Sequence, residues 1–126
     1  MFAPIRMKNS RDRLGDLDPD LFRRTWDHFP AKLAEELKGR VAVNALWPQT
    51  WIATAAIWNR GQNLIKQCRK PEIMADAAHA ILMKGSDVTG KFFIDEHVLR
   101  EEGLKDFNSY ACVPGATLRR DLYLEA

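Results

Sequence analysis

The stretch GRVAVNALWPQTWIATAA, residues 39–56, decides the fold class of this chain. Val41, Val43 and the apolar residues up to Trp47 predict a short strand covered on both faces, as in a parallel sheet beneath helices. Pro48 ends this strand, because proline lacks the N–H that a sheet requires. The stretch therefore predicts a buried strand that leads into a polar loop.

Helical patterns lie on both sides of this strand. Before it, apolar residues recur at three- and four-residue steps from Phe22 to Leu37, and Pro30 predicts either a kink or two abutting helices, 19–28 and 30–38. After it, the sequence predicts helices over 52–58, 61–68 and 71–84, a second short strand at KFFID, and one or two helical turns over 96–102. The alternation of helices and strands favours an α/β fold with a parallel sheet.

The number of expected strands is too small for a complete fold of this class. Sheets usually contain about four to six strands, and two strands buried on both faces would need neighbours that this sequence does not supply. The chain is therefore expected to be one end of an α/β fold.

Composition excludes several classes of function. At 126 residues the chain is long enough for one domain, and its 46% hydrophobic and 29% charged residues are typical of soluble globular proteins. A net charge of +2 is too small to indicate a nucleic-acid partner, and no apolar run approaches the ~20 residues of a membrane-spanning helix. Cys68 and Cys112 make neither a metal pattern nor a disulfide framework, which favours reduced thiols and a cytoplasmic location.

Three stretches share their order and spacing with one enzyme family. They are AEELKGRVAVNALWPQTWIATAA, QCRKPEIMADAAHAIL and VTGKFFIDEHVLREEGLKDFNSYACVPG. From about Ala34 onward the chain resembles the C-terminal part of a short-chain dehydrogenase/reductase of the hydroxysteroid dehydrogenase-like branch. The resemblance implies a doubly wound Rossmann sheet of parallel strands, of which this chain is the C-terminal portion, incomplete at its N-terminal side. Members of the family bind NAD or NADP and transfer hydride to a carbonyl or from an alcohol.

The resemblance also implies a cofactor loop directly after the strand. Pro48 would open the loop beside the nicotinamide, Ile52 would offer backbone groups to the carboxamide, and Thr54 would offer its hydroxyl to the carboxamide or a phosphate. Gln49 and Thr50 belong to the same expected cofactor-binding set. The alternative for Gln49, Thr50 and Thr54 is ordinary capping of a helix that starts near Ile52.

The catalytic motifs of the family are absent from the sequence. The phosphate-binding turn is Gly-x-x-x-Gly-x-Gly, and no two glycines here are separated by a single residue. The family's proton donor is a tyrosine with a lysine four residues later, but Pro114 follows Tyr110 at that distance and the chain ends too soon after Tyr123. We therefore expect no catalytic residue in this chain and no tight binding of NAD or NADP by this chain alone.

The domain boundary expected from this comparison lies near residue 30. Residues 1–30 form a leader and helix that do not match the family, and residues 31–126 are the C-terminal part of its domain. A truncated or frame-shifted gene and a deliberately shortened chain both explain the mismatch.

Two functions of different class follow from the resemblance. In the first, the chain supplies the nicotinamide-side loop of an oxidoreductase whose activity needs an intact relative or a complex. In the second, it is a non-enzymatic module that joins full-length oxidoreductase subunits through the last helix and strand of the family's fold, which are here the helix from Pro71 and the strand at KFFID. Self-association is expected in either case, and neither a nucleic acid, a membrane nor a metal ion is an expected partner.

Overall fold

The computed structural model describes residues 19–121 and Leu124, with side chains from His28 onward. The expected order of helix, strand, helices, strand and helix is confirmed. The elements are α1 (Pro19–Glu36), β1 (Ala45–Trp47), α2 (Ala55–Trp58), the 3-10 helix η1 (Gln62–Gln67), α3 (Glu72–Leu82), β2 (Phe92–Ile94), α4 (Asp95–Glu101) and the 3-10 helix η2 (Asn108–Tyr110).

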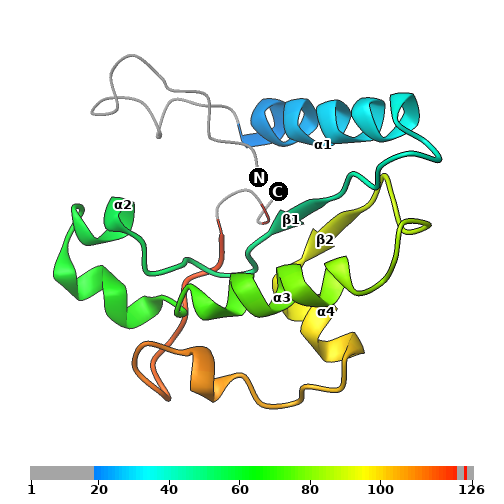
Figure 1. Cartoon of the computed structure of the whole chain (residues 1–126). Coiled ribbons are helices and arrows are strands. Elements are labelled where there is room, and N and C mark those ends of the chain that lie inside the picture. The colour runs from blue at the N-terminus through cyan, green and yellow to red at the C-terminus, as the bar shows by residue number, and fades with distance from the viewer. Residues whose placement is uncertain (1–18, 122–123, 125–126) are drawn as a thin grey trace.

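The two strands form a parallel pair, as the sequence predicts. Their register places Ala45 opposite Phe92 and Trp47 opposite Ile94. Figure 1 shows α1 on one side of this pair and α3 and α4 on the other, which is the layered arrangement of an α/β fold.

The first strand is shorter and less buried than expected. Residues 41–44 are not part of β1, although the N–H of Gly90 donates to the carbonyl of Val43 (2.7 Å). The other bonds there involve side chains: the N–H of Val43 donates to Thr89 Oγ1 (2.9 Å), and the Asn44 amide donates to the carbonyl of Val88 (2.8 Å). All residues of β1 and β2 are half-buried rather than covered on both faces. Within the described part of the chain, only this one strand pair forms a sheet, so each strand has a single strand neighbour.

The helices also differ from expectation in their bounds. The prediction of two separate helices divided at Pro30 is wrong, since α1 continues through it. The helix expected over 52–58 begins only at Ala55, and the one expected over 61–68 is the 3-10 helix η1. Gly39 follows α1 with φ of +81°, a left-handed conformation that glycine adopts without strain and that ends a helix. None of the described helices is long and apolar enough to cross a membrane.

The hydrophobic core lies between α3 and α4. The face of α3 expected from the sequence is confirmed, and its three residues join one buried cluster with residues of α4 and the segment after it; the members are Ile73, Ala77, Ile81, Val98, Leu99 and Phe107. Leu46 of β1 and Phe93 of β2 pack against this cluster. The core therefore connects the two helices to one face of the strand pair.

Truncation of the core should destabilise the protein strongly. Ile73 is fully buried, so Ile73→Ala removes packed methylene groups and leaves a cavity, at a cost of about 2–5 kcal/mol. Urea unfolding followed by circular dichroism measures this change. Val113→Ala, at an exposed apolar position outside the cluster, is the matched control and should change the free energy of unfolding by less than about 0.5 kcal/mol. Equal effects of the two substitutions would contradict this location of the core.

Candidate functional site

Residues 48–54 form a loop at the carboxyl end of β1. The strand ends at Trp47, and the loop crosses to α2, whose first residue is Ala55. Thr50 and Trp51 are buried in the middle of the loop, whereas Thr54 at its end is exposed. In parallel α/β sheets, ligands bind outside the carboxyl ends of the strands, so this loop occupies the position where a ligand is expected.

Backbone hydrogen bonds hold the loop from two directions. On one side Arg69 donates its N–H to the carbonyl of Trp51 and accepts the N–H of Ala53, both at 2.9 Å. On the other side the N–H of Trp51 donates to the carbonyl of Arg119 (2.9 Å), and the N–H of Asp121 donates to the carbonyl of Gln49 (3.0 Å). The segment 119–121, near the red end of the chain in Figure 1, therefore runs beside the loop as a short antiparallel partner.

The backbone of Ile52 takes no part in these bonds. Arg69 bonds to the residues before and after it, and within the described chain the N–H of Ile52 has no hydrogen-bond partner. Its carbonyl accepts the N–H of Thr54 (2.8 Å). Among the described residues, the N–H of Ile52 is thus a donor without a partner, on a loop that hydrogen bonds hold on both sides.

The two threonines of the loop differ in their positions. Thr54 is the N-cap residue of α2 and its carbonyl accepts the N–H of Trp58 (2.9 Å), but its side chain makes no capping hydrogen bond. The hydroxyl of Thr50 is buried and has no partner among the described residues. Pro48 and Gln49 are half-buried, and both backbone groups of Gln49 are occupied by other parts of the chain, so only its side-chain amide could reach a ligand.

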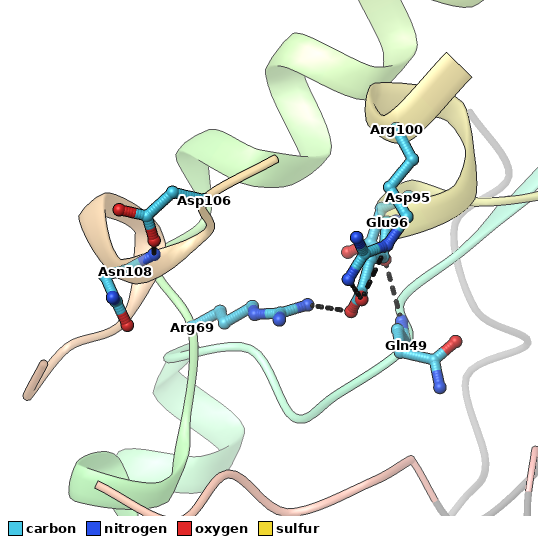
Figure 2. A network of polar contacts seen from close by, with 7 residues as sticks. All are labelled: Gln49, Arg69, Asp95, Glu96, Arg100, Asp106 and Asn108. Atoms are coloured by element: carbon cyan, nitrogen blue, oxygen red, sulfur yellow. Dashed lines mark hydrogen bonds and ion pairs between the residues drawn. The ribbon is translucent and has the colours of Figure 1, made fainter. Parts of the chain in front are cut away.

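Asp95 connects the second strand to the loop. It follows β2 directly, is fully buried, and its Oδ1 accepts the N–H of Gln49 (2.9 Å) and the N–H of Glu96 (2.6 Å). Figure 2 shows the Asp95 carboxylate pointing at Gln49 across the ends of the two strands. The other oxygen, Oδ2, has no partner in the described part of the chain. Burial raises the pKa of Asp95 above its ordinary value, and this outweighs the two N–H bonds and the charge of Arg69, which lower it.

Two arginines surround Glu96. Arg69 Nη1 lies 2.7 Å from Glu96 Oε2, and Arg100 Nη2 lies 2.6 Å from Oε1 (Figure 2). Both guanidinium groups also lie over the ring of Phe107, at 5.2 and 4.8 Å from its centre. Burial raises the pKa of Glu96, but the hydrogen bonds and charges of the two arginines outweigh it and hold the pKa below its ordinary value. The buried side chain of Arg69 is thereby fixed while its backbone supports the loop.

Tyr110 lies in an environment that does not suit a proton donor. Its hydroxyl donates to Asp76 Oδ2, and this hydrogen bond, with burial, raises the pKa of Tyr110 to about 12. A neighbouring lysine would have the opposite effect on a tyrosine. Tyr123 lies outside the described residues, and those that are described contain no group of three side chains able to hold a metal ion.

The sequence analysis did not identify the residues that position this loop. Asp95 carries a recognisable signal, because an acid at the end of an apolar strand lies where polar groups gather in an α/β sheet. Arg69 and residues 119–121 act through their backbones, which leave no signal in the identity of the side chain.

Comparison with known proteins gives a consistent group of relatives. Hydroxysteroid dehydrogenase-like protein 2 of Xenopus laevis is 55% identical to this chain over 94 residues, and the human protein of the same name is 50% identical over the same length. In both cases the match covers 74% of this chain and 22% of the relative. The chain thus spans less than a quarter of the curated relatives that it matches. No family model matches the chain.

Solved structures agree with these relatives. A short-chain dehydrogenase from Mycobacterium thermoresistibile is 43% identical with a TM-score of 0.69, over 76% of this chain and 35% of that one. A putative dehydrogenase from Xanthomonas campestris is 44% identical with a TM-score of 0.72, over 79% of this chain and 38% of that one.

The buried carboxyl of Asp95 should make stability depend on pH. The pKa of Asp95 is raised above 3.8 in the folded protein. At a pH between 3.8 and the raised pKa, the folded protein keeps a proton that the unfolded chain has lost. Stability therefore falls as the pH rises through that window. Asp95→Asn cannot titrate. The free energy of unfolding of the unmodified protein, minus that of Asp95→Asn, should therefore decrease from about pH 4 to about pH 7 in urea titrations.

The matched control for this experiment is Asp87→Asn. Asp87 is exposed and lies outside the loop and the core, so this substitution shows the effect of an aspartate-to-asparagine change that removes no buried carboxyl. If the free energy of unfolding of the unmodified protein, minus that of Asp95→Asn, increased with pH instead, the two N–H bonds would outweigh burial in their effect on the pKa of Asp95.

Proposed function

Because this chain belongs to the short-chain dehydrogenase/reductase family, in its hydroxysteroid dehydrogenase-like branch, we propose that residues 48–54 form the nicotinamide-side loop of an NAD(P)-dependent oxidoreductase. The chain is the C-terminal portion of the Rossmann-type fold of that family, with β1 and β2 as neighbouring parallel strands. The cofactor of such an enzyme supplies or accepts the hydride. The proposed role of this chain is to hold one end of that cofactor in position.

The free N–H of Ile52 is the observation that carries this proposal. A carboxamide presents a carbonyl oxygen and an amide group, and it is held in place by a backbone donor on a rigid loop together with a nearby acceptor or hydroxyl. The free donor of Ile52 and the exposed hydroxyl of Thr54 lie two residues apart on such a loop. The hydrogen bonds from Arg69 and Asp121 fix the loop before any ligand arrives, which lowers the entropic cost of binding.

The chain by itself is proposed to be catalytically incomplete. Its sequence contains neither the glycine-rich turn that would bind the pyrophosphate nor the tyrosine and lysine pair that would transfer the proton. Hydride transfer then requires a second polypeptide, or a longer form of the protein, that carries those groups. NAD and NADP are both compatible with this loop.

Exposed apolar surface favours a second role in assembly. Both strands are half-buried, and Leu82 and Met83 at the end of α3 are among the most exposed large apolar side chains of the described residues. We propose that this end of α3 joins the chain to a second copy or to full-length subunits of the family. The two roles are compatible, because the cofactor loop precedes α2 and lies away from this end of the helix.

Complementation tests the proposed cofactor loop. The chain would be mixed with the preceding part of a full-length family member that contains the glycine-rich turn and the Tyr-x-x-x-Lys pair. We expect NADPH binding, measured by calorimetry, in the mixture and not in either polypeptide alone. Ile52→Pro removes the free N–H, and Thr54→Val removes the hydroxyl. Each should weaken binding about three- to tenfold, the value of one hydrogen bond.

Two conservative variants serve as controls for complementation. Ile52→Val keeps the backbone donor and Thr54→Ser keeps the hydroxyl, so both should bind NADPH as the unmodified chain does. Equal binding by Ile52→Pro would contradict the role of the loop. NADPH-dependent reduction of a carbonyl by the isolated chain would contradict its catalytic incompleteness.

Sedimentation velocity tests the proposed assembly surface. Association of the isolated chain should increase with concentration, and Leu82→Ser combined with Met83→Ser should weaken it at least about tenfold, because two large apolar side chains no longer gain from burial. Trp58→Ser, at an exposed apolar position on α2, is the control and should leave association unchanged. A compact monomer at every concentration would contradict the assembly role.

A further inference from the structure

The two cysteines lie opposite each other on neighbouring segments. Cys68 follows η1 and Cys112 follows η2, and the residues beside them, Arg69 and Ala111, form an antiparallel bridge. The N–H of Cys112 donates to the carbonyl of Cys68 (3.1 Å), and the N–H of Lys70 donates to the carbonyl of Tyr110 (2.6 Å). This pattern makes Cys68 and Cys112 a directly opposed cross-strand pair.

Directly opposed residues have the spacing that a disulfide needs. In antiparallel pairs their side chains project from the same face, and their Cα atoms lie about 4.5–5.5 Å apart. Cys68 and Cys112 share one of the two bonds of a regular pair, because the N–H of Cys68 donates to the carbonyl of Ile65 (3.0 Å). Disulfides span Cα distances of about 4.4–6.8 Å, with Cβ atoms somewhat closer together than in an unlinked strand pair. The linkage therefore requires only a small local adjustment of the backbone. Neither cysteine forms a disulfide in this structure: the thiol of Cys68 is fully buried and donates to the carbonyl of Leu64 (3.3 Å), and Cys112 is half-buried.

We propose that Cys68 and Cys112 form a reversible intramolecular disulfide by exchange with a low-molecular-weight disulfide of the glutathione class. The Cys112 thiolate, which is the more accessible, attacks one sulfur of the oxidant, forms a mixed disulfide and releases one thiol. The Cys68 thiolate then attacks the Cys112 sulfur and expels the second thiol. Two electrons pass from the protein sulfurs to the oxidant, and the two protons pass to the released thiols.

The position of this pair gives the disulfide a structural consequence. Arg69 is bonded to Trp51 and Ala53 of the cofactor loop on one side and is paired with Ala111 on the other. A covalent bond between the neighbouring residues 68 and 112 would fix the segment that supports the loop. The amide of Ala53, which donates to Arg69, should then exchange with solvent at least several-fold more slowly in the oxidised protein.

The experiment uses the purified 126-residue chain in buffers of increasing oxidised-to-reduced glutathione ratio. Burial raises the pKa of both thiols, so few thiolates exist at neutral pH and equilibration must be allowed to take hours. After free thiols are blocked, we expect a monomer lighter by two hydrogens. Trypsin should release peptide 67–69 linked to peptide 106–119, and the reductant dithiothreitol should separate them. The same samples give the exchange rate of Ala53 by hydrogen–deuterium exchange.

Two variants complete the design. Cys112→Ser and Cys68→Ser each remove one sulfur, and neither should yield the linked peptides or the slower exchange of Ala53. Cys112→Ser changes a half-buried position and should remain folded, so it keeps the test valid if Cys68→Ser does not fold. Only mixed disulfides with glutathione, or only disulfides between chains, would overturn the proposal. This result does not depend on binding of a dinucleotide, so it can fail independently of the proposed function.

Discussion

The arrangement of the loop depends on one buried carboxylate. Asp95 lies where β2 ends and accepts the N–H of Gln49, which lies just after the end of β1. Neighbouring parallel strands are not joined by a hairpin turn. The segments that follow their carboxyl ends are therefore held together only if another contact links them. Asp95 supplies it, and its burial makes the connection strong, because a hydrogen bond to a charged group gains strength where water is excluded.

This connection has an energetic cost that the surrounding residues reduce. One oxygen of Asp95 has no partner in the described chain, and a buried unpaired polar atom destabilises the folded state. The positive charge of Arg69 favours the ionised carboxyl, while Arg69 is itself neutralised by Glu96. The same arginine supports the loop through its backbone. The charges and the loop therefore form one cooperative unit, in which the loss of one member leaves the others buried without compensation.

The sequence predicts the elements of this fold better than their details. The apolar face of α3 has a periodic pattern and the strand at Phe92–Ile94 is a short apolar run, and the structure confirms both. The length of β1 was not predictable from hydrophobicity, because the side chains of Asn44 and Thr89 make several of the hydrogen bonds before Ala45. The loop residues were identified only through the family resemblance. Their supports, residues 69 and 119–121, could not be identified, since backbone groups hold the loop whatever the side chain is.

The loop is supported mainly by hydrogen bonds to the loop itself and less by the sheet, because the sheet around β1 is small and its strands are half-buried. In a complete sheet, strands on both sides would fix the carboxyl end of β1, but here the described residues supply a single strand neighbour. The loop is instead fixed by isolated bridges to residues 69 and 120 and by Asp95. These bonds involve residues 48–54 themselves and do not depend on further strands of a sheet. The loop can therefore keep its geometry without such strands, which is the physical condition for the proposed role of this chain as one part of a shared site.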